Sequence, residues 1–318
     1  MRFVFMGSPP FAVPVLDHLL ASRHECVALV TRPDRPRGRG RAVQTSPLVE
    51  RAREHDIPTL QPESTRGDDF LETVTKLAPD VLMVASYGEI LRTPVLELAP
   101  HGALNVHASL LPRWRGASPI QRAILAGDAT TGVSVQRIVL ALDQGDVLLA
   151  LETPIDADET SGDLFERLAE LGGEAAVASL DRLESGDAKF TPQDEAGVTH
   201  AKKLTKADGW IDWSRPAVEL ERFVRGMHPW PGARTRLPDQ RELRVLSSRI
   251  DPNPPAALGQ ATPGTLLPVP DRLCLATGDG ALELVQVQPQ GKKTMDASAF
   301  QRGAHLQPGD LWTAPDAP

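Results

Sequence analysis

Two polar residues interrupt an apolar run at residues 103–108, which reads ALNVHA. In a β-strand, side chains two residues apart point to the same face, so Asn105 and His107 project together. An amide and an imidazole on one face offer a neutral hydrogen-bond donor and a group that exchanges a proton near neutral pH. From this pair alone, a structural role in capping the next segment is equally well supported.

A candidate partner for the imidazole lies in LDQGD, residues 142–146, between two apolar runs. Asp-x-Gly between such runs is most often an ordinary turn. If the loop instead faces the Asn-x-His pair, a carboxylate from Asp143 or Asp146 can pair with the imidazole and orient it for catalysis. The residues themselves leave open whether the contact exists and which acid makes it.

The residues after His107 predict a shaped loop rather than more strand. Pro112 has no backbone donor and restricts Leu111 to an extended conformation, so SLLP at 109–112 cannot continue a central strand. Ser118-Pro119 is then a good helix start. Arg113 and Arg115 lie between these features without an assigned role.

A concentration of arginines occurs in TRPDRPRGRGR, residues 31–41, with Arg32, Arg35, Arg37, Arg39 and Arg41 against one Asp. A solvated surface loop is the plain alternative. The whole chain is acidic, with 34 Lys+Arg against 42 Asp+Glu. On such a protein, a local cationic loop is what binding to a phosphate backbone requires, and we favour that interpretation.

The elements that position these residues alternate between short apolar runs and longer amphipathic stretches. The apolar runs at 2–7, 26–31, 81–86 and 103–108 predict buried strands, and helices are predicted over 10–21, 46–55 and 118–126. This alternation is typical of an α/β domain with a Rossmann-like, doubly wound, mostly parallel sheet. We expect it to occupy residues 1–187.

A second, smaller domain is predicted after a linker at 188–207. Residues 208–318 contain one helix candidate at 217–227, followed by Pro- and Gly-punctuated β-like runs at 241–250, 272–280 and 281–291. Short strands with frequent turns predict an OB-like β-barrel. The last residues, 311–318, are expected to be frayed.

Several classes of protein are disfavoured by what the sequence lacks. The motifs G-x-G-x-x-G after the first strand, G-x-x-x-x-G-K-[ST], H-E-x-x-H and G-x-S-x-G are absent, so nicotinamide, P-loop, zinc-hydrolase and serine-esterase chemistry lack their usual signals. Cys26 and Cys274 are far apart in apolar runs, which indicates neither a disulfide framework nor a metal cluster. No signal peptide or membrane span is expected, and we predict a cytoplasmic protein.

Taken together, these motifs resemble the folate-dependent formyltransferases, and among them the members that act on an aminoacyl-tRNA. The Asn-x-His, SLLP and LDQGD motifs carry the resemblance to the superfamily, together with FMGSPPFAVPVL and ASYGEIL. The arginine-rich insertion and the second domain, with KLTKADGWIDWS, HPWPGA and QGKKTMDASAFQRG, select the tRNA-directed members. The likeness covers nearly the whole chain.

The resemblance implies roles position by position. Asn105, His107 and Asp143 match the family's catalytic trio. Ser109, Leu110, Leu111 and Pro112 match its folate-binding signature, and Ser86, Tyr87, Gly88, Ile90 and Leu91 match the loop that helps to enclose the pteridine. Arg35, Arg37, Arg39 and Arg41 are implied to contact tRNA.

The implied reaction moves a formyl group from 10-formyltetrahydrofolate, as co-substrate, to the free amine of initiator methionyl-tRNA, by a monomer without metal. Asn105 and His107 would stabilise the developing oxyanion, and Asp143 would orient His107 and help to move a proton. Formyltransferases of glycinamide ribonucleotide or sugar nucleotides are the first alternative, but should lack the arginine-rich insertion and the second domain. A non-catalytic tRNA-binding protein is the second, and the intact trio argues against it.

Overall fold

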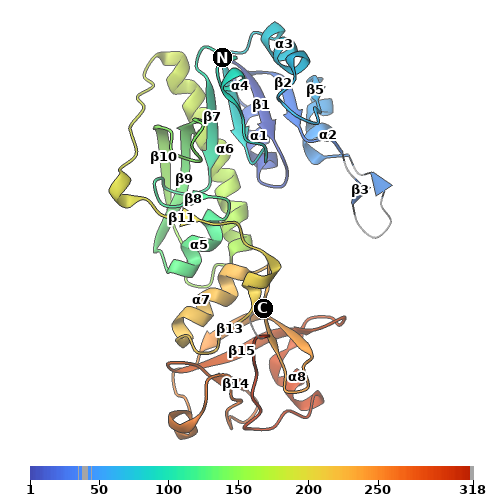
Figure 1. Cartoon of the computed structure of the whole chain (residues 1–318), viewed down its shortest axis with the longest axis vertical. Helices are drawn as coiled ribbons and strands as arrows, with labels where there is room; N and C mark the ends of the chain where they lie inside the picture. The colour runs from blue at the N-terminus through green and yellow to red at the C-terminus, as the bar shows by residue number, and fades with distance from the viewer. Residues whose placement is uncertain (35, 38–41, 44, 316–318) are drawn as a thin grey trace. The chain divides into compact units, whose positions relative to one another are not determined.

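The computed structural model describes residues 1–34, 36–37, 42–43 and 45–315, and the chain divides into two compact units (Figure 1). Unit 1 comprises Met1–Pro119, Thr130–Pro154 and Phe165–Ala201. Unit 2 comprises Ile120–Ala129, Ile155–Leu164 and Lys202–Pro318. Residues 188–201, predicted as part of a linker, therefore belong to unit 1.

Unit 1 is built on a sheet whose described strands follow the order β10-β9-β7-β6-β1-β2-β5. The five strands from β7 to β5 are parallel, whereas β9 and β10 are antiparallel to their neighbours. The predicted Rossmann-like, mostly parallel sheet is thus confirmed. The strands are β1 (Arg2–Gly7), β2 (Glu25–Thr31), β5 (Thr59–Leu60), β6 (Val81–Ala85), β7 (Ala103–His107), β9 (Thr130–Arg137) and β10 (Val147–Pro154).

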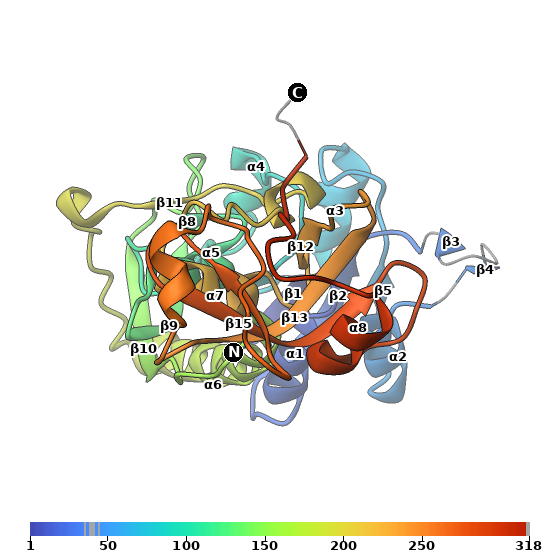
Figure 2. The same cartoon turned by 90° about the horizontal axis from the view of Figure 1, so that it is seen from below.

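Helices cover both faces of this sheet (Figure 2). On one face, α3 (Asp68–Lys76) and α4 (Thr93–Leu96) pack onto a buried cluster that includes Val4 and Leu82. The other face is covered by α1 (Ala12–Leu20), α2 (Pro47–Glu54) and the part of α6 (Ser161–Ser185) that lies in unit 1. Because both faces are buried, the strands are almost continuously apolar, as the sequence predicts.

The face that carries Asn105 and His107 follows from strand register. Asn105 lies opposite Val84 of β6, and Val84 belongs to the cluster under α3 and α4. Val106 points to the opposite face, where Gly172 of α6 lies so close that a methyl group on it would be 3.1 Å from Val106 Cγ1. The two polar side chains are therefore on the α3 and α4 side of the sheet.

Short elements surround the carboxyl ends of the strands. β8 (Arg115–Gly116) pairs in parallel with β11 (His200–Ala201), and η1 (Glu195–Gly197) precedes β11. β3 (Pro36–Arg37) and β4 (Ala42–Val43) form an antiparallel pair in the arginine-rich segment. Arg35, Arg39 and Arg41 lie outside the described residues, and only the backbone of Arg37 is described.

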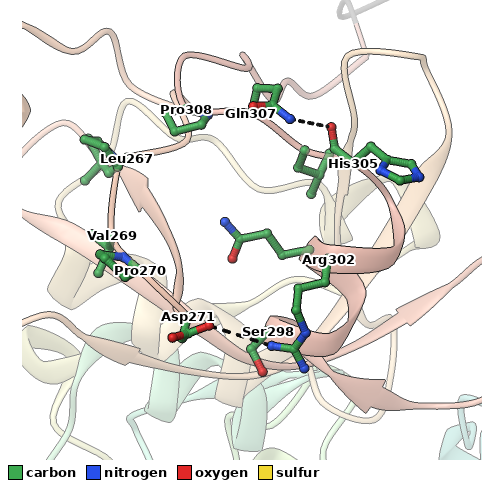
Figure 3. Close-up of a pocket in the computed structure, with 12 residues that line it drawn as sticks. Leu267, Val269, Pro270, Asp271, Ser298, Arg302, His305, Gln307 and Pro308 are labelled. Atoms are coloured by element: carbon green, nitrogen blue, oxygen red, sulfur yellow. Dashed lines mark hydrogen bonds and ion pairs between the residues drawn. The ribbon is translucent and has the colours of Figure 1, made fainter.

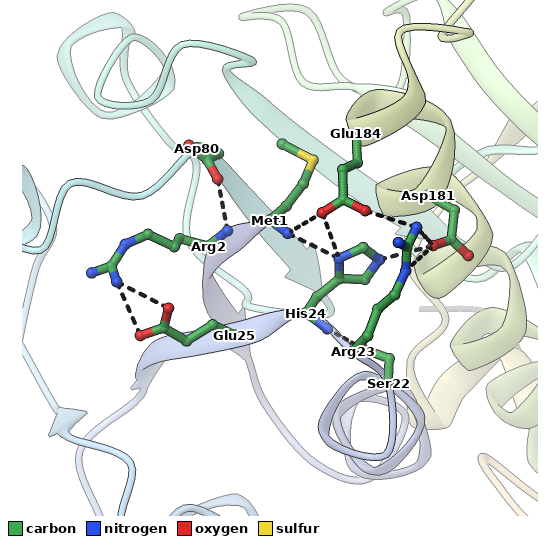
Figure 4. A network of polar contacts seen from close by, with 9 residues as sticks. All are labelled: Met1, Arg2, Ser22, Arg23, His24, Glu25, Asp80, Asp181 and Glu184. Carbon is green, nitrogen blue, oxygen red and sulfur yellow. Dashed lines mark hydrogen bonds and ion pairs between the residues drawn. The ribbon is translucent and has the colours of Figure 1, made fainter.

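A polar network joins the first two strands to α6 (Figure 4). The His24 side chain is fully buried, and its Nε2 lies 3.2 Å from Asp181 Oδ1. Burial is the main cause that lowers the pKa of His24. Arg23 also pairs with Asp181 and with Glu184, at 2.6 and 2.7 Å, so the two residues just before β2 are held to the last turns of α6.

Unit 2 contains an antiparallel sheet that curls around one core. Its described strands follow the order β12-β13-β15-β14, with β16 also paired to β15, and irregular register within β13 near Ser247 bends the sheet. The helices α7 (Ala217–Met227) and α8 (Ala297–Gly303) complete the core. The predicted barrel-like second domain is confirmed. The remaining elements are β12 (Ala233–Arg236), β13 (Glu242–Ile250), β14 (Leu273–Ala276), β15 (Ala281–Pro289), β16 (Met295–Asp296), η2 (Lys206–Gly209), η3 (Ala256–Gln260) and α5 (Pro119–Ala126), most of which lies in unit 2.

The prediction that residues 311–318 are frayed is wrong for Leu311, Trp312 and Thr313. Trp312 is 1% exposed and belongs to the core of unit 2. Its backbone N–H donates to Gly264 over 2.9 Å, and Leu311 and Thr313 make β-bridges to Thr265 and Arg236. The apolar area of one buried indole outweighs the tendency of a terminal segment to fray.

Among the described helices, none is long and apolar enough to cross a membrane.

Candidate functional site

The paired strands β7 and β9 bring four polar side chains to one face at the edge where ligands bind open α/β sheets. Asn105 lies opposite Gln136, and His107 lies opposite Ser134. Directly opposed residues of antiparallel strands share a face. Asn105 is half-buried, and within the described part of the chain its amide makes no hydrogen bond. The amide of Asn105 is therefore available to a substrate.

His107 is held in one orientation by the loop that follows it. Its Nε2 lies 2.7 Å from the carbonyl oxygen of Trp114, and a carbonyl only accepts, so Nε2 carries a hydrogen. The other ring nitrogen, Nδ1, lies 3.7 Å from Asp143 Oδ1. Both side chains are about nine-tenths buried, at 8% and 10% exposed. Nδ1 is therefore the atom at which His107 gains or loses its proton.

Asp143 is the acid of the LDQGD motif that faces the imidazole. Gln136 Nε2 donates to Oδ1 over 3.0 Å, and the backbone N–H of Gly116 donates to Oδ2 over 2.9 Å. Asp143 has a φ of 53°, a left-handed conformation that Asp tolerates better than most residues. Both carboxylate oxygens are thus held, and the choice that the sequence left open is resolved in favour of a contact from Asp143.

Two glycines allow the backbone around Asp143 to pack closely. A methyl group on Gly145 would overlap the backbone carbonyl of Arg137. Gly116, at a φ of 119°, passes Ala201 so closely that a methyl group there would be 2.6 Å from its carbonyl oxygen. Larger residues at either position would displace the loop that carries Asp143 or the donor to its Oδ2.

The SLLP loop is braced by buried hydroxyls. Ser109 is 1% exposed, and its Oγ donates to the carbonyl of Trp114 at 3.0 Å and accepts from the N–H of Trp114 at 2.9 Å. Ser134 Oγ donates to the carbonyl of Ser109 and accepts from the N–H of Leu111. Leu110, Leu111 and Pro112 are half-buried at the surface of this loop. Ser109 therefore shapes the loop, and the three residues after it form its outer wall.

The SYGEIL loop after β6 has an outer and an inner layer. Ile90 is 73% exposed, whereas Tyr87 and Leu91 are 2% and 5% exposed and belong to the core cluster beneath. Burial raises the pKa of Tyr87 to about 12. Ser86 and Gly88 have φ values of 52° and 81°, which mark the sharp turn that turns Ile90 outward.

Three polar residues near Asp143 were not predicted from the sequence. Gln136 is 2% exposed and Arg115 is 3% exposed, and both connect to Gln193 of the predicted linker. Ser134 and Gln136 lie two positions apart in the buried strand β9, and this alternation in the sequence predicts a polar face on the strand. Gln193 lies in an aperiodic segment and has no comparable local signal.

Other features of the described residues lie apart from this site. Unit 2 has a cavity of about 510 Å3 between the loop at 267–271 and α8, where Arg302 pairs with Asp271 at 4.0 Å (Figure 3). It contains none of the residues that the sequence predicts to be functional. No group of three or more His, Cys, Asp or Glu side chains within the described residues is arranged to hold a metal ion.

Comparison with known proteins places the chain in a family. Residues 1–180 match the model of the family described as "Formyl transferase", and residues 203–305 match "Formyl transferase, C-terminal domain". A methionyl-tRNA formyltransferase of Symbiobacterium thermophilum is 44% identical over 100% of this chain and 97% of its own length. The chain belongs to the methionyl-tRNA formyltransferase family. A member from Parvibaculum lavamentivorans is 46% identical over 98% of this chain and 99% of its own length.

Solved structures share the fold at lower identity. An N-formyltransferase of Helicobacter canadensis, in complex with folinic acid and dTDP-3-aminofucose, matches with a TM-score of 0.67 at 14% identity, over 91% of this chain and 99% of its own. HypX of Aquifex aeolicus with tetrahydrofolic acid matches with a TM-score of 0.62 at 18% identity, over 95% of this chain and 47% of its own. These likenesses extend the fold of the methionyl-tRNA formyltransferase family to more distant proteins.

Proposed function

We propose that this chain transfers the formyl group of 10-formyltetrahydrofolate to the free amino group of methionyl-initiator-tRNA, which gives N-formylmethionyl-tRNA for translation initiation. The observation that carries the proposal is the 44% identity to a methionyl-tRNA formyltransferase over both units and nearly the whole length of each chain. The arrangement of Asn105, His107 and Asp143 supports a catalytic trio at the carboxyl edge of the sheet.

The donor set fits a formyl-transfer reaction. The co-substrate supplies a formyl carbonyl whose oxygen becomes negatively charged when the amine adds to its carbon. Asn105 offers a half-exposed amide without a partner among the described residues, so it can donate to that oxygen without first breaking a hydrogen bond. Removal of one such donor typically costs about 10²–10³ in rate.

His107 acts through Nδ1, because its Nε2–H is already donated to Trp114. When Nδ1 is protonated, the ring is a second donor toward the oxyanion and forms an ion pair with Asp143 at 3.7 Å. When Nδ1 is unprotonated, it is an acceptor for the proton that the amine must lose. The pair of His107 and Asp143 thus holds the proton that moves between the amine and the leaving nitrogen.

Asp143 contributes a fixed negative charge. Its two oxygens accept from Gln136 Nε2 and from the N–H of Gly116, and these bonds hold the carboxylate in one orientation. In this role Asp143 orients His107 and balances the charge of the imidazolium. No protein nucleophile enters the proposed reaction.

The contacts with the two substrates are also part of the proposal. We assign the SLLP loop and the SYGEIL loop to the folate, with Ile90 on the exposed side of its loop. We assign Arg35, Arg37, Arg39 and Arg41 to the phosphate backbone of the tRNA, because five arginines with one acid between residues 31 and 41 concentrate positive charge on an acidic chain.

The test is a formyl-transfer assay with the purified full-length protein and 10-formyltetrahydrofolate. The acceptors are methionyl-initiator-tRNA, free methionine, glycinamide ribonucleotide and an amino-sugar nucleotide, in separate reactions. We expect formylation of the charged tRNA only. Transfer to either nucleotide acceptor, without transfer to the tRNA, would overturn the proposal.

We also propose that the protein acts as a monomer in the cytoplasm, where its tRNA substrate is used. The family likeness supports both statements. Light scattering coupled to size-exclusion chromatography tests the first, with a mass near 34.4 kDa as the expected result. A stable dimer mass would contradict it.

A further inference from the structure

The side chain of Gln193 reaches from the predicted linker to the loop that carries Asp143. Its Nε2 lies 2.9 Å from the carbonyl oxygen of Asp143 and 2.7 Å from that of Gly145. The same nitrogen lies 3.2 Å from Gln136 Oε1. On the other side, Arg115 Nε donates to Gln193 Oε1 over 2.9 Å. One half-buried amide thus contacts both the backbone of the loop and the side chain that holds the Asp143 carboxylate.

The direction of these hydrogen bonds is fixed at both ends. A guanidinium only donates, so Arg115 requires the oxygen of the Gln193 amide to face it, and Nε2 must face the carbonyl oxygens. Gln136 then presents Oε1 to Gln193 and its own Nε2 to Asp143. A carboxylate only accepts hydrogen bonds, so Asp143 Oδ1 is the final acceptor of this series. Each amide therefore has one orientation that satisfies its neighbours.

The anchor of this series of hydrogen bonds, Arg115, is buried. Arg115 is 3% exposed, and its NH2 also pairs with Glu195 at 2.8 Å. The segment that carries Gln193 is fastened on both sides by backbone pairs. Thr191 and Val147 exchange two hydrogen bonds of 2.9 Å, and Ala117 donates to Ala201 over 2.8 Å. Gln193 is thus presented to the Asp143 loop from a fixed backbone.

We propose that Gln193, anchored by Arg115, is a positioning residue that holds the Asp143 carboxylate toward His107. The inference rests on the proposed function, since it assigns Gln193 a part in the same reaction. Gln193 acts through Gln136 and through the backbone of residues 143–145, and touches no reacting atom. Without its donors, Gln136 is free to turn its oxygen toward Asp143, which removes the donor to Oδ1.

The decisive variants are Gln193→Ala and Gln193→Glu. The first removes the amide. The second keeps its size and its contact with Arg115, but replaces the donor by an acceptor, which attracts Gln136 Nε2 away from Asp143. We expect both variants to lower kcat by roughly 10- to 100-fold, with little change in KM for either substrate. This loss is part of the rate enhancement of about 10²–10⁴ that a positioned acid–base group contributes.

A further readout separates positioning from a merely structural role. In a double-mutant cycle, Gln193→Ala has no further effect once Asp143→Ala is present. Additive losses, or a glutamate variant with the activity of the wild type, would show that Gln193 only fills space.

A matched control is Glu195→Ala, which removes the other partner of Arg115 without touching the donors to Asp143. Glu195 is 75% exposed, so its ion pair contributes little, and we expect wild-type kcat. Crystal structures of both Gln193 variants provide a test that does not depend on enzymatic activity. We expect Gln136 or the Asp143 carboxylate to be turned in them, and an unchanged pair overturns the inference even if the formyl acceptor proves to be different. If the wild type formylates methionyl-tRNA and both Gln193 variants keep full kcat, only the inference about Gln193 fails.

Discussion

His107 donates from Nε2 to the backbone carbonyl oxygen of Trp114 over 2.7 Å, and this bond decides which ring nitrogen is chemically available. The nitrogen that remains, Nδ1, lies 3.7 Å from Asp143 Oδ1. A histidine whose ring is fixed in this way has one exchangeable position rather than two. The orientation is set by the loop that follows β7, because the same carbonyl of Trp114 also accepts from Ser109 Oγ.

The two amide replacements of His107 should therefore differ. His107→Asn places an amide nitrogen near the position of Nδ1, whereas His107→Gln places one near Nε2 and restores only the bond to Trp114. We expect both to lose activity, with a higher kcat for the asparagine variant. Steady-state kinetics with saturating folate measures the difference, and a more active glutamine variant would assign the chemistry to Nε2 instead.

Asn105→Ala should lower kcat by about 10²–10³, because it removes a donor to the oxygen that becomes negatively charged. Asn105 is half-buried, and its amide has no partner within the described residues, so the fold should not depend on it. Thermal unfolding checks that point. A variant with an unchanged melting temperature and near-normal turnover would remove Asn105 from the trio.

Gly145→Ala should reduce turnover although no side chain of the trio is altered. The added methyl group would overlap the carbonyl of Arg137, so the loop has to shift and carry Asp143 with it. We expect a fall in kcat of about 10-fold or more, with folate binding less affected. Gly67→Ala is the control, since a methyl group there meets nothing within 4 Å. Equal kinetics for the two variants would argue against the shift.

The stability of unit 1 should fall as the pH drops below about 6.5. The pKa of His24 is lowered by burial, so between its folded value and the ordinary value of 6.5 the unfolded chain binds more protons than the folded one. The stability contributed by neutral His24 is complete above pH 6.5 and declines as the pH falls through that window. Urea unfolding from about pH 7.5 to pH 5 tests this, because His24→Asn should flatten the dependence relative to the wild type.

Arg37→Ala and Arg39→Ala should weaken tRNA binding and make it less sensitive to salt. Each arginine that neutralises a phosphate releases counterions, so its loss should reduce the slope of log K against log salt by about 1. Binding of tRNA over a salt series measures both effects. The exposed Arg53 on α2 supplies the control, and a loop variant with the same slope as Arg53→Ala would contradict the assignment.

The core of the fold could be predicted because its signals are local. Asn105 and His107 share a face as strand alternation requires, and β1, β2, β6 and β7 lie within one residue of the apolar runs that predict them. The partner of His107 could not be chosen from LDQGD alone. The choice depends on the left-handed backbone at Asp143 and on the close packing of Gly145 against the backbone of Arg137.

The failures come from contacts between distant parts of the chain. Trp312 looks like part of a Pro-rich tail, but its burial depends on Gly264 and on a core assembled from residues 204–300. Gln193 looks like a linker residue, since its hydrogen bonds go to residues about 50 to 80 positions earlier. No periodic pattern in the local sequence predicts such contacts. Gln136, in contrast, could have been predicted from its alternation with Ser134.

The pairing of β8 with β11 means that unit 1 extends to Ala201, beyond the end at residue 187 that the sequence predicts for the first domain. A fragment cut at residue 187 would retain Asn105, His107 and Asp143, yet it would lose Gln193 and the strand against which Gly116 packs. The hydrogen bonds that hold the Asp143 loop are therefore completed only by residues after position 187. Exchange of everything after residue 187 would therefore also remove contacts that hold the Asp143 loop and β8 of the first unit.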